Sequence, residues 1–189
     1  MRHAPERGSG LPDIAGTRSG RLAIAGCGRS LWDDMRALGD WPDAWMAVNA
    51  AGMHLPSVPQ HWASAESDYF QYWLPLRGFT WHGDRKVMHC KAQIHAPKPG
   101  PFVQHVWPFT GEGTSSLFAV KVGLALGYGE IVLCGVPLDG AGHYYDAPWF
   151  SNEDYDQPGF LLDWERNTES FKGRVRSMSG RTREILGGL

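Results

Sequence analysis

The most constraining feature of this sequence is a short apolar run that ends in a glycine turn and leads directly into a helix. Residues 21–26 read Arg-Leu-Ala-Ile-Ala-Gly, and the turn closes at Gly28. A continuous apolar run of this length, bounded by turn residues, is typical of a buried strand. Ser30 then occupies a position suited to a helix N-cap, and apolar residues recur at helical spacing over 31–38. A second apolar run at 44–49 completes a strand–helix–strand unit, which predicts two parallel neighbouring strands.

The same alternation returns in the second half of the chain. Residues 117–126 carry apolar side chains at two sets of helical positions, which predicts a helix buried nearly all round. Residues 130–135 follow as another buried strand. Weaker strand patterns occupy 61–65, 86–90 and 102–107, and a short helix is expected at 67–73. The alternation predicts an α/β fold with a mostly parallel central sheet that helices cover on both faces.

Length and composition predict one domain. The chain has 189 residues, and we expect a flexible N-terminal arm over 1–20 and a single domain over 21–189 with a basic C-terminal segment. With 42% hydrophobic and 20% charged residues, the chain is not a disordered tail. Its net charge of −2 lacks the general basic field of a dedicated nucleic-acid or membrane-surface binder.

The cysteines and the apolar runs bear on the cellular compartment. Three cysteines are present without a CxxC pair, so no disulfide framework is expected. The first residues form no apolar segment, and no run reaches the roughly 18 residues of a membrane span. We expect a soluble, cytoplasmic protein with no membrane partner.

Candidate ligand-binding loops follow the predicted strands. Ligands of open parallel sheets bind at the carboxyl ends of the strands, which here carry the loops 26–30, 49–52 and 135–140. The small residues of the turn 111–116 would let backbone N–H groups approach a phosphate at the start of a helix. Asn49 could read a base or ribose through its amide, or form an Asx turn. Each glycine turn also has the simpler interpretation of a tight connection without a ligand.

Several of these motifs together resemble one known group of proteins. They are Ile-Ala-Gly-Cys-Gly-Arg-Ser-Leu at 24–31, the strand-end Asn49, Gly-Thr-Ser-Ser at 113–116 and Ala-Leu-Gly-Tyr-Gly-Glu-Ile-Val-Leu-Cys-Gly at 125–135. This set resembles the bacterial sialyltransferases of glycosyltransferase family forty-two and the related motility-accessory and pterin-diphosphokinase-like proteins. The resemblance implies a Rossmann-like three-layer domain that binds a nucleotide or nucleotide-sugar and requires no further cofactor. The nucleotide-binding residues that it implies are Gly26, Gly28, Ser30, Asn49, Thr114 and Ser115.

The resemblance also points to catalytic candidates in the loop 139–146. In the sialyltransferases, two tyrosines after the corresponding strand assist the departing phosphate; Tyr145 falls near the second position, and Asp139 occupies the first. That family uses a downstream histidine as general base, whereas this chain has no histidine after His143. His143 could itself accept a proton from an acceptor hydroxyl, or be an ordinary exposed loop residue. Asp139 or Asp146 could orient His143, act as the base, or serve only as turn residues.

Metal sites are weakly indicated. Asp154 and Asp156 have the spacing of paired carboxylates that hold Mg²⁺ or Mn²⁺ against a diphosphate, but so short a match favours an acidic surface loop. Only a diphosphokinase-like function would need Mg²⁺ there. The zinc candidates, which are His89, Cys90, His95 and His105, lack the usual ligand spacing, so we expect no metal site.

The basic stretch from Arg174 to Arg183 leaves several functions open. A solvated helix face is favoured, and the alternatives are a phosphate clamp or contact with nucleic acid or another chain. The leading hypothesis is a sialyltransferase-like or other nucleotide-dependent glycosyl or phosphoryl transferase. Its acceptor would be bound by loops or by a second subunit of a homo-oligomer. The alternative is a catalytically inactive nucleotide-binding or assembly module of the same fold.

Overall fold

The computed structural model describes residues 10–77, 87–91, 102–109, 113–149 and 158–189, and its centre is a seven-stranded sheet. Every hydrogen-bonded pair of neighbouring strands is parallel. The strand order is β5-β4-β3-β2-β1-β6-β7, which confirms the α/β fold with a parallel sheet that the sequence predicts. The strands are β1 (Arg21–Ala25), β2 (Ala44–Val48), β3 (His61–Ser64), β4 (Val87–Lys91), β5 (His105–Trp107), β6 (Glu130–Cys134) and β7 (Val175–Ser177).

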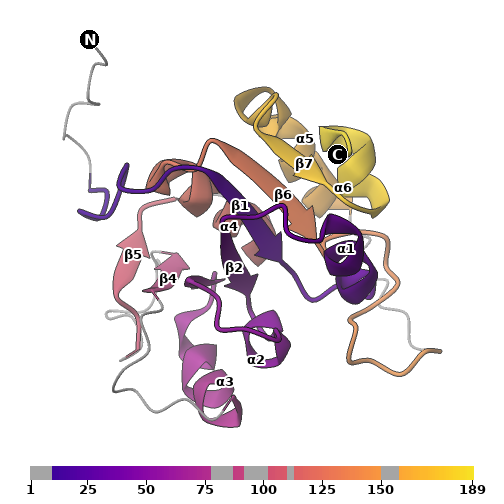
Figure 1. Ribbon diagram of the computed structural model, residues 1–189, viewed down its shortest axis with the longest axis horizontal. Helices are drawn as coiled ribbons and strands as arrows, with labels where there is room; N and C mark the ends of the chain where they lie inside the picture. The colour runs from indigo at the N-terminus through magenta and orange to yellow at the C-terminus, as the bar shows by residue number, and fades with distance from the viewer. Residues whose placement is uncertain (1–9, 78–86, 92–101, 110–112, 150–157) are drawn as a thin grey trace.

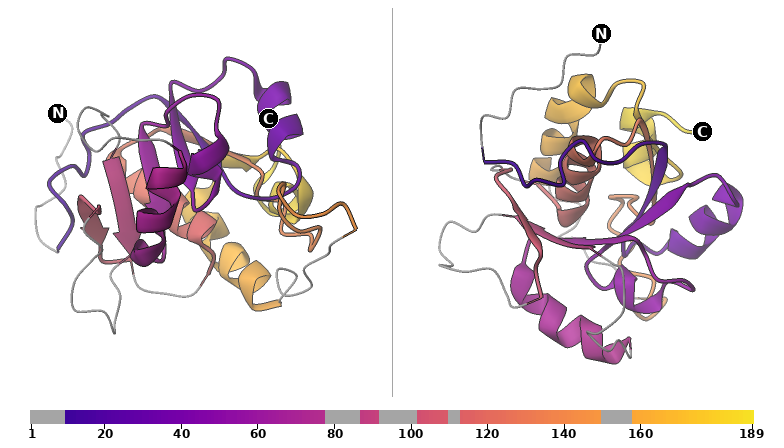
Figure 2. Two further views of the ribbon diagram at one scale, coloured as in Figure 1. Left: turned by 90° about the horizontal axis from the view of Figure 1, so that it is seen from below. Right: turned by 60° about the vertical axis from the view of Figure 1, so that its left-hand side comes forward.

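Helices cover both faces of the sheet, which gives three layers (Figure 1). The right-hand view of Figure 2 shows the sheet nearly edge-on between α4, α5 and α6 on one side and α1, α2 and α3 on the other. No helix in the described ranges has the length and apolar character needed to cross a membrane. The helices are α1 (Leu31–Leu38), α2 (Ala51–His54), α3 (Phe70–Leu76), α4 (Ser115–Leu126), α5 (Pro158–Phe171) and α6 (Gly180–Leu186), with a 3₁₀ turn, η1, at Ser67–Tyr69.

Helix α4 is the centre of one of two apolar cores. Nearly all of its apolar side chains are buried, as the two-sided pattern predicts, and they pack against the sheet through Leu22 and Ile131. A Cβ atom at Gly123 would lie 2.7 Å from the Leu22 side chain, so the glycine lets the helix approach the strands closely. Thr114 caps the helix by accepting the backbone N–H of Leu117. The cap fixes the start of α4 beside the carboxyl ends of the strands.

Residues 10–20 contact the end of α4, although the sequence predicts a flexible arm over 1–20. The backbone N–H of Gly16 donates to Ala125 at 2.9 Å, and that of Arg18 donates to Leu126 at 2.8 Å. Ile14 packs against the same core as α4. These contacts satisfy carbonyl groups in the last turn of the helix. Residues 1–9 lie outside the described part of the chain.

The basic C-terminal stretch does not form the single solvated helix face that was favoured. Residues 175–177 form the edge strand β7, in which Val175 and Ser177 are buried and Arg176 is exposed. Helix α6 then packs back against the loop that follows β6. Thr182, which is fully buried, donates its hydroxyl to the Val136 carbonyl at 2.6 Å. Alternation of buried and charged residues in a short edge strand therefore accounts for Arg176, whereas Arg181 and Arg183 belong to α6.

A buried chain of hydrogen bonds crosses β3, β4 and β5. The indole N–H of Trp107 donates to Nδ1 of His89 at 3.0 Å, which places the proton of neutral His89 on Nε2. That atom lies 3.0 Å from Nδ1 of His61, whose Nε2 lies 3.0 Å from the Tyr128 hydroxyl. Burial lowers the pKa of His61 to about 4 and the pKa of His89 to about 2, so both rings are neutral.

Candidate functional site

The carboxyl ends of β1, β2, β3 and β6 open onto a cleft of about 590 Å³. The chain leaves β1 toward β2 and later returns to place β6 on the other side of β1, so the loops after β1 and β6 diverge here. Ligands of open α/β sheets bind at such a switch point. Much of the lining comes from residues 27–28, 48–50, 113–116 and 135–140, together with Phe160 of α5.

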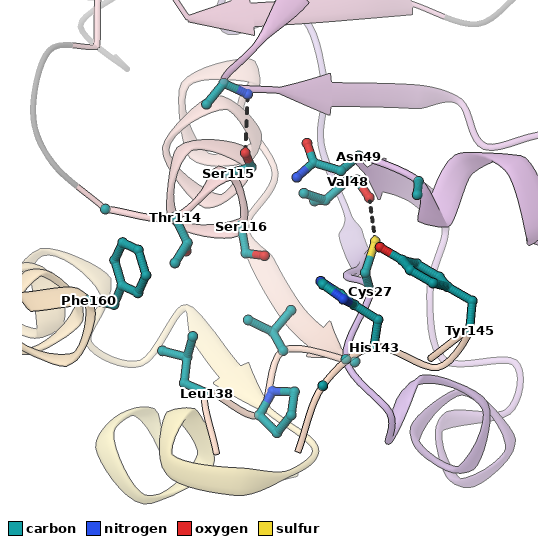
Figure 3. A pocket seen from close by; sticks show the side chains of 18 of the residues that line it. Cys27, Val48, Asn49, Thr114, Ser115, Ser116, Leu138, His143, Tyr145 and Phe160 are labelled. Carbon is teal, nitrogen blue, oxygen red and sulfur yellow. Dashed lines mark hydrogen bonds between the residues drawn. The ribbon is translucent and has the colours of Figure 1, made fainter. Parts of the chain in front are cut away.

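The start of α4 supplies one polar wall of the cleft. The Ser115 hydroxyl accepts the backbone N–H of Ala65 at 3.3 Å, and the Thr114 hydroxyl accepts that of Leu117 at 3.2 Å. Each hydroxyl therefore keeps its own proton for donation to a ligand. Figure 3 shows Ser116 directed into the open space beside them. Hydroxyl donors and the positive end of a twelve-residue helix together favour an anionic group.

Two residues of the cleft adopt left-handed backbone conformations that are uncommon outside glycine. They are Asn49, with φ of 51°, and Leu138, with φ of 50°. Asparagine tolerates this conformation, and here its carbonyl accepts the indole N–H of Trp62 at 2.7 Å. The Asn49 Oδ1 atom is buried without a hydrogen-bond partner in the described structure. Strained backbone and an unpaired polar atom concentrate at functional sites.

The loop after β6 is held against the loop after β1. Gly28 and His143 form an isolated antiparallel bridge, in which the N–H of Tyr144 donates to the Cys27 carbonyl at 2.9 Å. Arg29 extends this connection, because its guanidinium donates to the carbonyl oxygen of Ala147 at 3.0 Å and to that of Pro148 at 2.6 Å. These contacts position the 142–148 segment at one end of the cleft.

His143 and Asp146 form a hydrogen-bonded pair within that segment. Oδ2 of Asp146 lies 3.0 Å from Nδ1 of His143 and also accepts the His143 backbone N–H at 2.7 Å. Both side chains are largely covered, with exposed fractions of 19% and 18%. The ring of His143 stacks on Tyr145 at a centroid distance of 4.8 Å. A carboxylate at Nδ1 favours the tautomer that protonates this nitrogen, which leaves Nε2 as a proton acceptor.

Of the residues that the sequence predicts for the nucleotide-binding and catalytic site, Gly26, Ser30 and Asp146 do not line the cleft, and the others do. A Cβ atom at Gly26 would lie 2.5 Å from the Gly135 carbonyl oxygen, so this glycine serves the close packing of two loops. The Ser30 hydroxyl donates to Asp34 at 2.9 Å and lies 2.8 Å from that of Ser179. It makes no capping bond to α1, contrary to the expectation. The residues brought together are Gly28, Asn49, Thr114, Ser115, Asp139, His143 and Tyr145.

Asp139 and Cys27 are two further polar residues that line the cleft. Oδ1 of Asp139 accepts the N–H of Ala141 at 3.1 Å, which is an Asx turn, and the side chain is exposed. The Cys27 thiol lies 3.5 Å from the Val48 carbonyl oxygen, and burial raises its pKa to about 12. A thiol with so high a pKa stays protonated at neutral pH and is a poor nucleophile.

Sequence reasoning missed the residues that follow β3. Glu66, Tyr69 and Trp73 line the cleft, although no glycine turn marks the end of this strand. Phe160 was missed as well, and Ser116 was predicted only as part of the turn 111–116. Among the described residues, no group of three or more His, Cys, Asp or Glu side chains is arranged to hold a metal ion. Asp154, Asp156 and His95 lie outside the described ranges.

Solved structures of sialyltransferases share this fold. The sialyltransferase CST-II in complex with a trisaccharide acceptor and CMP is 17% identical, with a TM-score of 0.60 over 89% of this chain and 85% of that one. CstII from Campylobacter jejuni in complex with the substrate analogue CMP-3FNeuAc is 15% identical, with a TM-score of 0.55 over the same shares. No protein-family model and no curated protein sequence matches the chain. The similarity predicted from the motifs is thus confirmed at the level of the fold.

Proposed function

We propose that this protein is a sialyltransferase-like glycosyltransferase that uses a nucleoside monophosphate-linked sugar as donor. The observation that carries the proposal is the arrangement of the cleft, where the hydrogen-bond donors at the start of α4 share one space with His143, which is paired with Asp146. An anion site beside a positioned general base is what transfer from a nucleotide-sugar requires. The complexes of CST-II with CMP and with CMP-3FNeuAc support this class of ligand.

The charge of the cleft favours a donor with a single phosphate. No lysine or arginine is among the described residues that line it, whereas Glu66 and Asp139 are. A diphosphate or triphosphate would bring several negative charges toward these carboxylates without a cation to offset them. Backbone N–H groups and the hydroxyls of Thr114 and Ser115 suffice for a singly charged phosphodiester. The diphosphokinase-like function stays a prediction, because Asp154 and Asp156, on which it depends, lie outside the described residues.

The proposed reaction moves one proton and one glycosyl group. Nε2 of His143 takes the proton from an acceptor hydroxyl, and the acceptor oxygen forms a bond to the anomeric carbon of the donor sugar. The bond between that carbon and the phosphate oxygen breaks, and its electron pair leaves with the nucleoside monophosphate. The Tyr145 hydroxyl and the N–H groups at the start of α4 stabilise the charge on the departing phosphate. Asp146 holds the histidine ring and stabilises its positive charge after proton transfer.

A catalytically inactive nucleotide-binding module is the second candidate. It rests on Asp139, which stands where the resembled sialyltransferases carry a tyrosine and which closes an Asx turn in this loop. The carboxylate cannot donate a hydrogen bond to a phosphate when it is ionised. In this alternative the cleft binds the nucleotide, and no transfer follows.

Ligand-dependent thermal stability tests the binding step. CMP, UDP, ADP and ATP would each be added with and without Mg²⁺, and a ligand that binds only the folded state raises its apparent melting temperature. We expect CMP to raise it without metal. A shift with ATP that needs Mg²⁺ would instead favour a phosphoryl transferase, and no shift with any nucleotide would contradict the proposal.

Turnover separates the enzyme from the inactive module. With CMP-linked sialic acid as donor and lactose as acceptor, the wild-type protein is expected to release CMP. His143→Ala should keep its affinity for CMP while its turnover falls by about a hundredfold or more. CMP binding without release of CMP across a panel of acceptors would favour the inactive module. Unchanged turnover in the His143 variant would remove the assignment of the base.

A further inference from the structure

Three aromatic rings form a continuous stack that runs from the core to the wall of the cleft. The indoles of Trp62 and Trp73 are parallel within 12° at a centroid distance of 6.2 Å. The ring of Tyr69 continues the stack, parallel to Trp73 within 17° at 5.4 Å. Trp62 is fully buried, whereas Tyr69 is 48% exposed. The stack therefore starts in the core and ends at a half-exposed ring.

The inner part of the stack is held rigidly. Phe70 packs edge-on against Trp62 and Trp73, with interplanar angles of 87° for both pairs. The indole N–H of Trp62 donates to the carbonyl of Asn49, which itself lines the cleft. A Cβ atom at Gly52 would lie 2.0 Å from the Trp62 ring, so the neighbouring backbone leaves the ring little room to move. Because Trp62 and Trp73 are held in place, the Tyr69 ring that packs on them is also held in place without a ligand. This lowers the entropic cost of binding.

The outer rings belong to the same cleft as the proposed transfer site. Tyr69 and Trp73 both line it, and they belong to the segment that follows Ala65, whose N–H donates to Ser115 at the start of α4. A ligand anchored by its anionic group at α4 would therefore extend along the wall that carries Tyr69. Aromatic side chains at such positions bind flat rings by stacking.

We infer that Tyr69 is a ring-binding residue of this cleft, on which a nucleobase or a pyranose stacks as the next member of the aromatic series. This inference rests on the proposed function for the identity of the ligand. In that reaction the nucleobase of the donor and the pyranose of a sugar each present a flat face that can stack on Tyr69. Tyr69 sets specificity through the shape of the ring and takes no part in bond breaking.

Binding of CMP and of lactose distinguishes whether a nucleobase or a pyranose stacks on Tyr69. Affinity would be measured for CMP, for ribose 5-phosphate, which lacks the base, and for lactose, with wild-type protein and with Tyr69→Ala and Tyr69→Phe. If the nucleobase stacks, Tyr69→Ala should weaken CMP binding about tenfold or more and leave ribose 5-phosphate unchanged. If a pyranose stacks, the same variant should weaken lactose binding and leave CMP unchanged. Tyr69→Phe should bind like the wild type in both cases, because the ring is kept.

A matched control and an independent readout complete the test. Leu76→Ala removes an exposed apolar side chain of α3 that does not line the cleft, and its affinities should stay at wild-type values. Saturation-transfer NMR should show the strongest transfer to the base protons of CMP or to the ring protons of lactose. Affinities for both probes that are unchanged in Tyr69→Ala would overturn the inference. Failure of the wild type to bind any nucleotide would overturn the proposed function, and Tyr69-dependent lactose binding would still support the ring-binding residue.

Discussion

Nδ1 of His143 lies 3.0 Å from Oδ2 of Asp146, inside the loop that the β1 turn holds in place. Asp146→Asn keeps an acceptor for the ring but removes the negative charge that stabilises a protonated histidine. We expect turnover to fall by about a hundredfold with little change in nucleotide affinity. Steady-state kinetics that separate kcat from KM would measure both effects.

Asp139→Asn is the matched comparison for this prediction. Asp139 lies in the same loop, but its Oδ1 accepts the backbone N–H of Ala141 at 3.1 Å. The loss in turnover should therefore be smaller than in Asp146→Asn. A larger loss in Asp139→Asn than in Asp146→Asn would show that Asp139 orients His143 or is itself the base, which the sequence also allows.

Stability is expected to fall at mildly acidic pH because of His61 and His89. Both rings are neutral in the folded protein, with pKa values lowered from 6.5 to about 4 and about 2. As pH falls through 6.5, the unfolded chain binds protons that the folded chain excludes, so the free energy of unfolding decreases. Well above pH 6.5 these groups contribute no pH dependence. The slope approaches two protons, or about 2.7 kcal/mol per pH unit, between roughly pH 6 and pH 4.

Urea unfolding at pH 7.5, 6 and 5 would measure this slope. His61→Gln removes one of the two titrating groups, so it should lower stability at pH 7.5 and make the pH dependence about half as steep. A free energy of unfolding that stays level between pH 6.5 and pH 5 would contradict the assignment of two neutral buried histidines.

The sequence predicted the central elements of the fold because they are buried on both faces. Strands β1, β2 and β6 each contain a continuous apolar run, which is the pattern expected when a parallel sheet is covered by helices, and α4 carries apolar residues at two sets of helical positions. Strand β7 escaped prediction because it has three residues and exposes Arg176 between two buried neighbours. A charge run and a short edge strand look alike without knowledge of what packs beside them.

The candidate site was predicted only where a strand end carries a distinctive residue. Gly28, Asn49 and Thr114 were found from glycine turns, a strand-end amide and a helix start, and all three line the cleft. Tyr69 and Trp73 were not found, because an aromatic residue in a short helix looks like any core residue until its exposure is known. Their role depends on a stack with Trp62 that periodicity does not encode.

Ser30→Ala separates the sequence-based role of this serine from its place in the structure. Its hydroxyl donates to Asp34, which also accepts the Ser179 hydroxyl at 2.7 Å and the Gly135 N–H at 2.8 Å. Removal of one donor to this buried carboxylate should lower the free energy of unfolding by about 1–3 kcal/mol. CMP affinity should change little. A large loss of affinity at unchanged stability would restore Ser30 as a nucleotide-binding residue.

Gly180→Ala tests whether the C-terminal segment positions the loop after β6. Gly180 has φ of 64°, and an added Cβ would lie 2.3 Å from the Pro137 carbonyl oxygen, which also accepts the Arg181 N–H at 2.8 Å. The substitution combines left-handed strain with a backbone clash, and we expect a loss of about 3 kcal/mol in unfolding free energy. Since Pro137 lines the cleft, CMP affinity should fall as well.

Gly173→Ala is the control that isolates backbone strain from the clash. Its φ of 73° is similar, but an added Cβ would meet nothing within 4 Å. Only the left-handed strain of about 1–2 kcal/mol is expected, with CMP affinity unchanged because residue 173 does not line the cleft. Urea unfolding and a CMP titration of both variants would give the two differences. Equal losses in stability would mean that the loop yields to the clash, and that the contact between Gly180 and Pro137 does not hold the wall of the cleft.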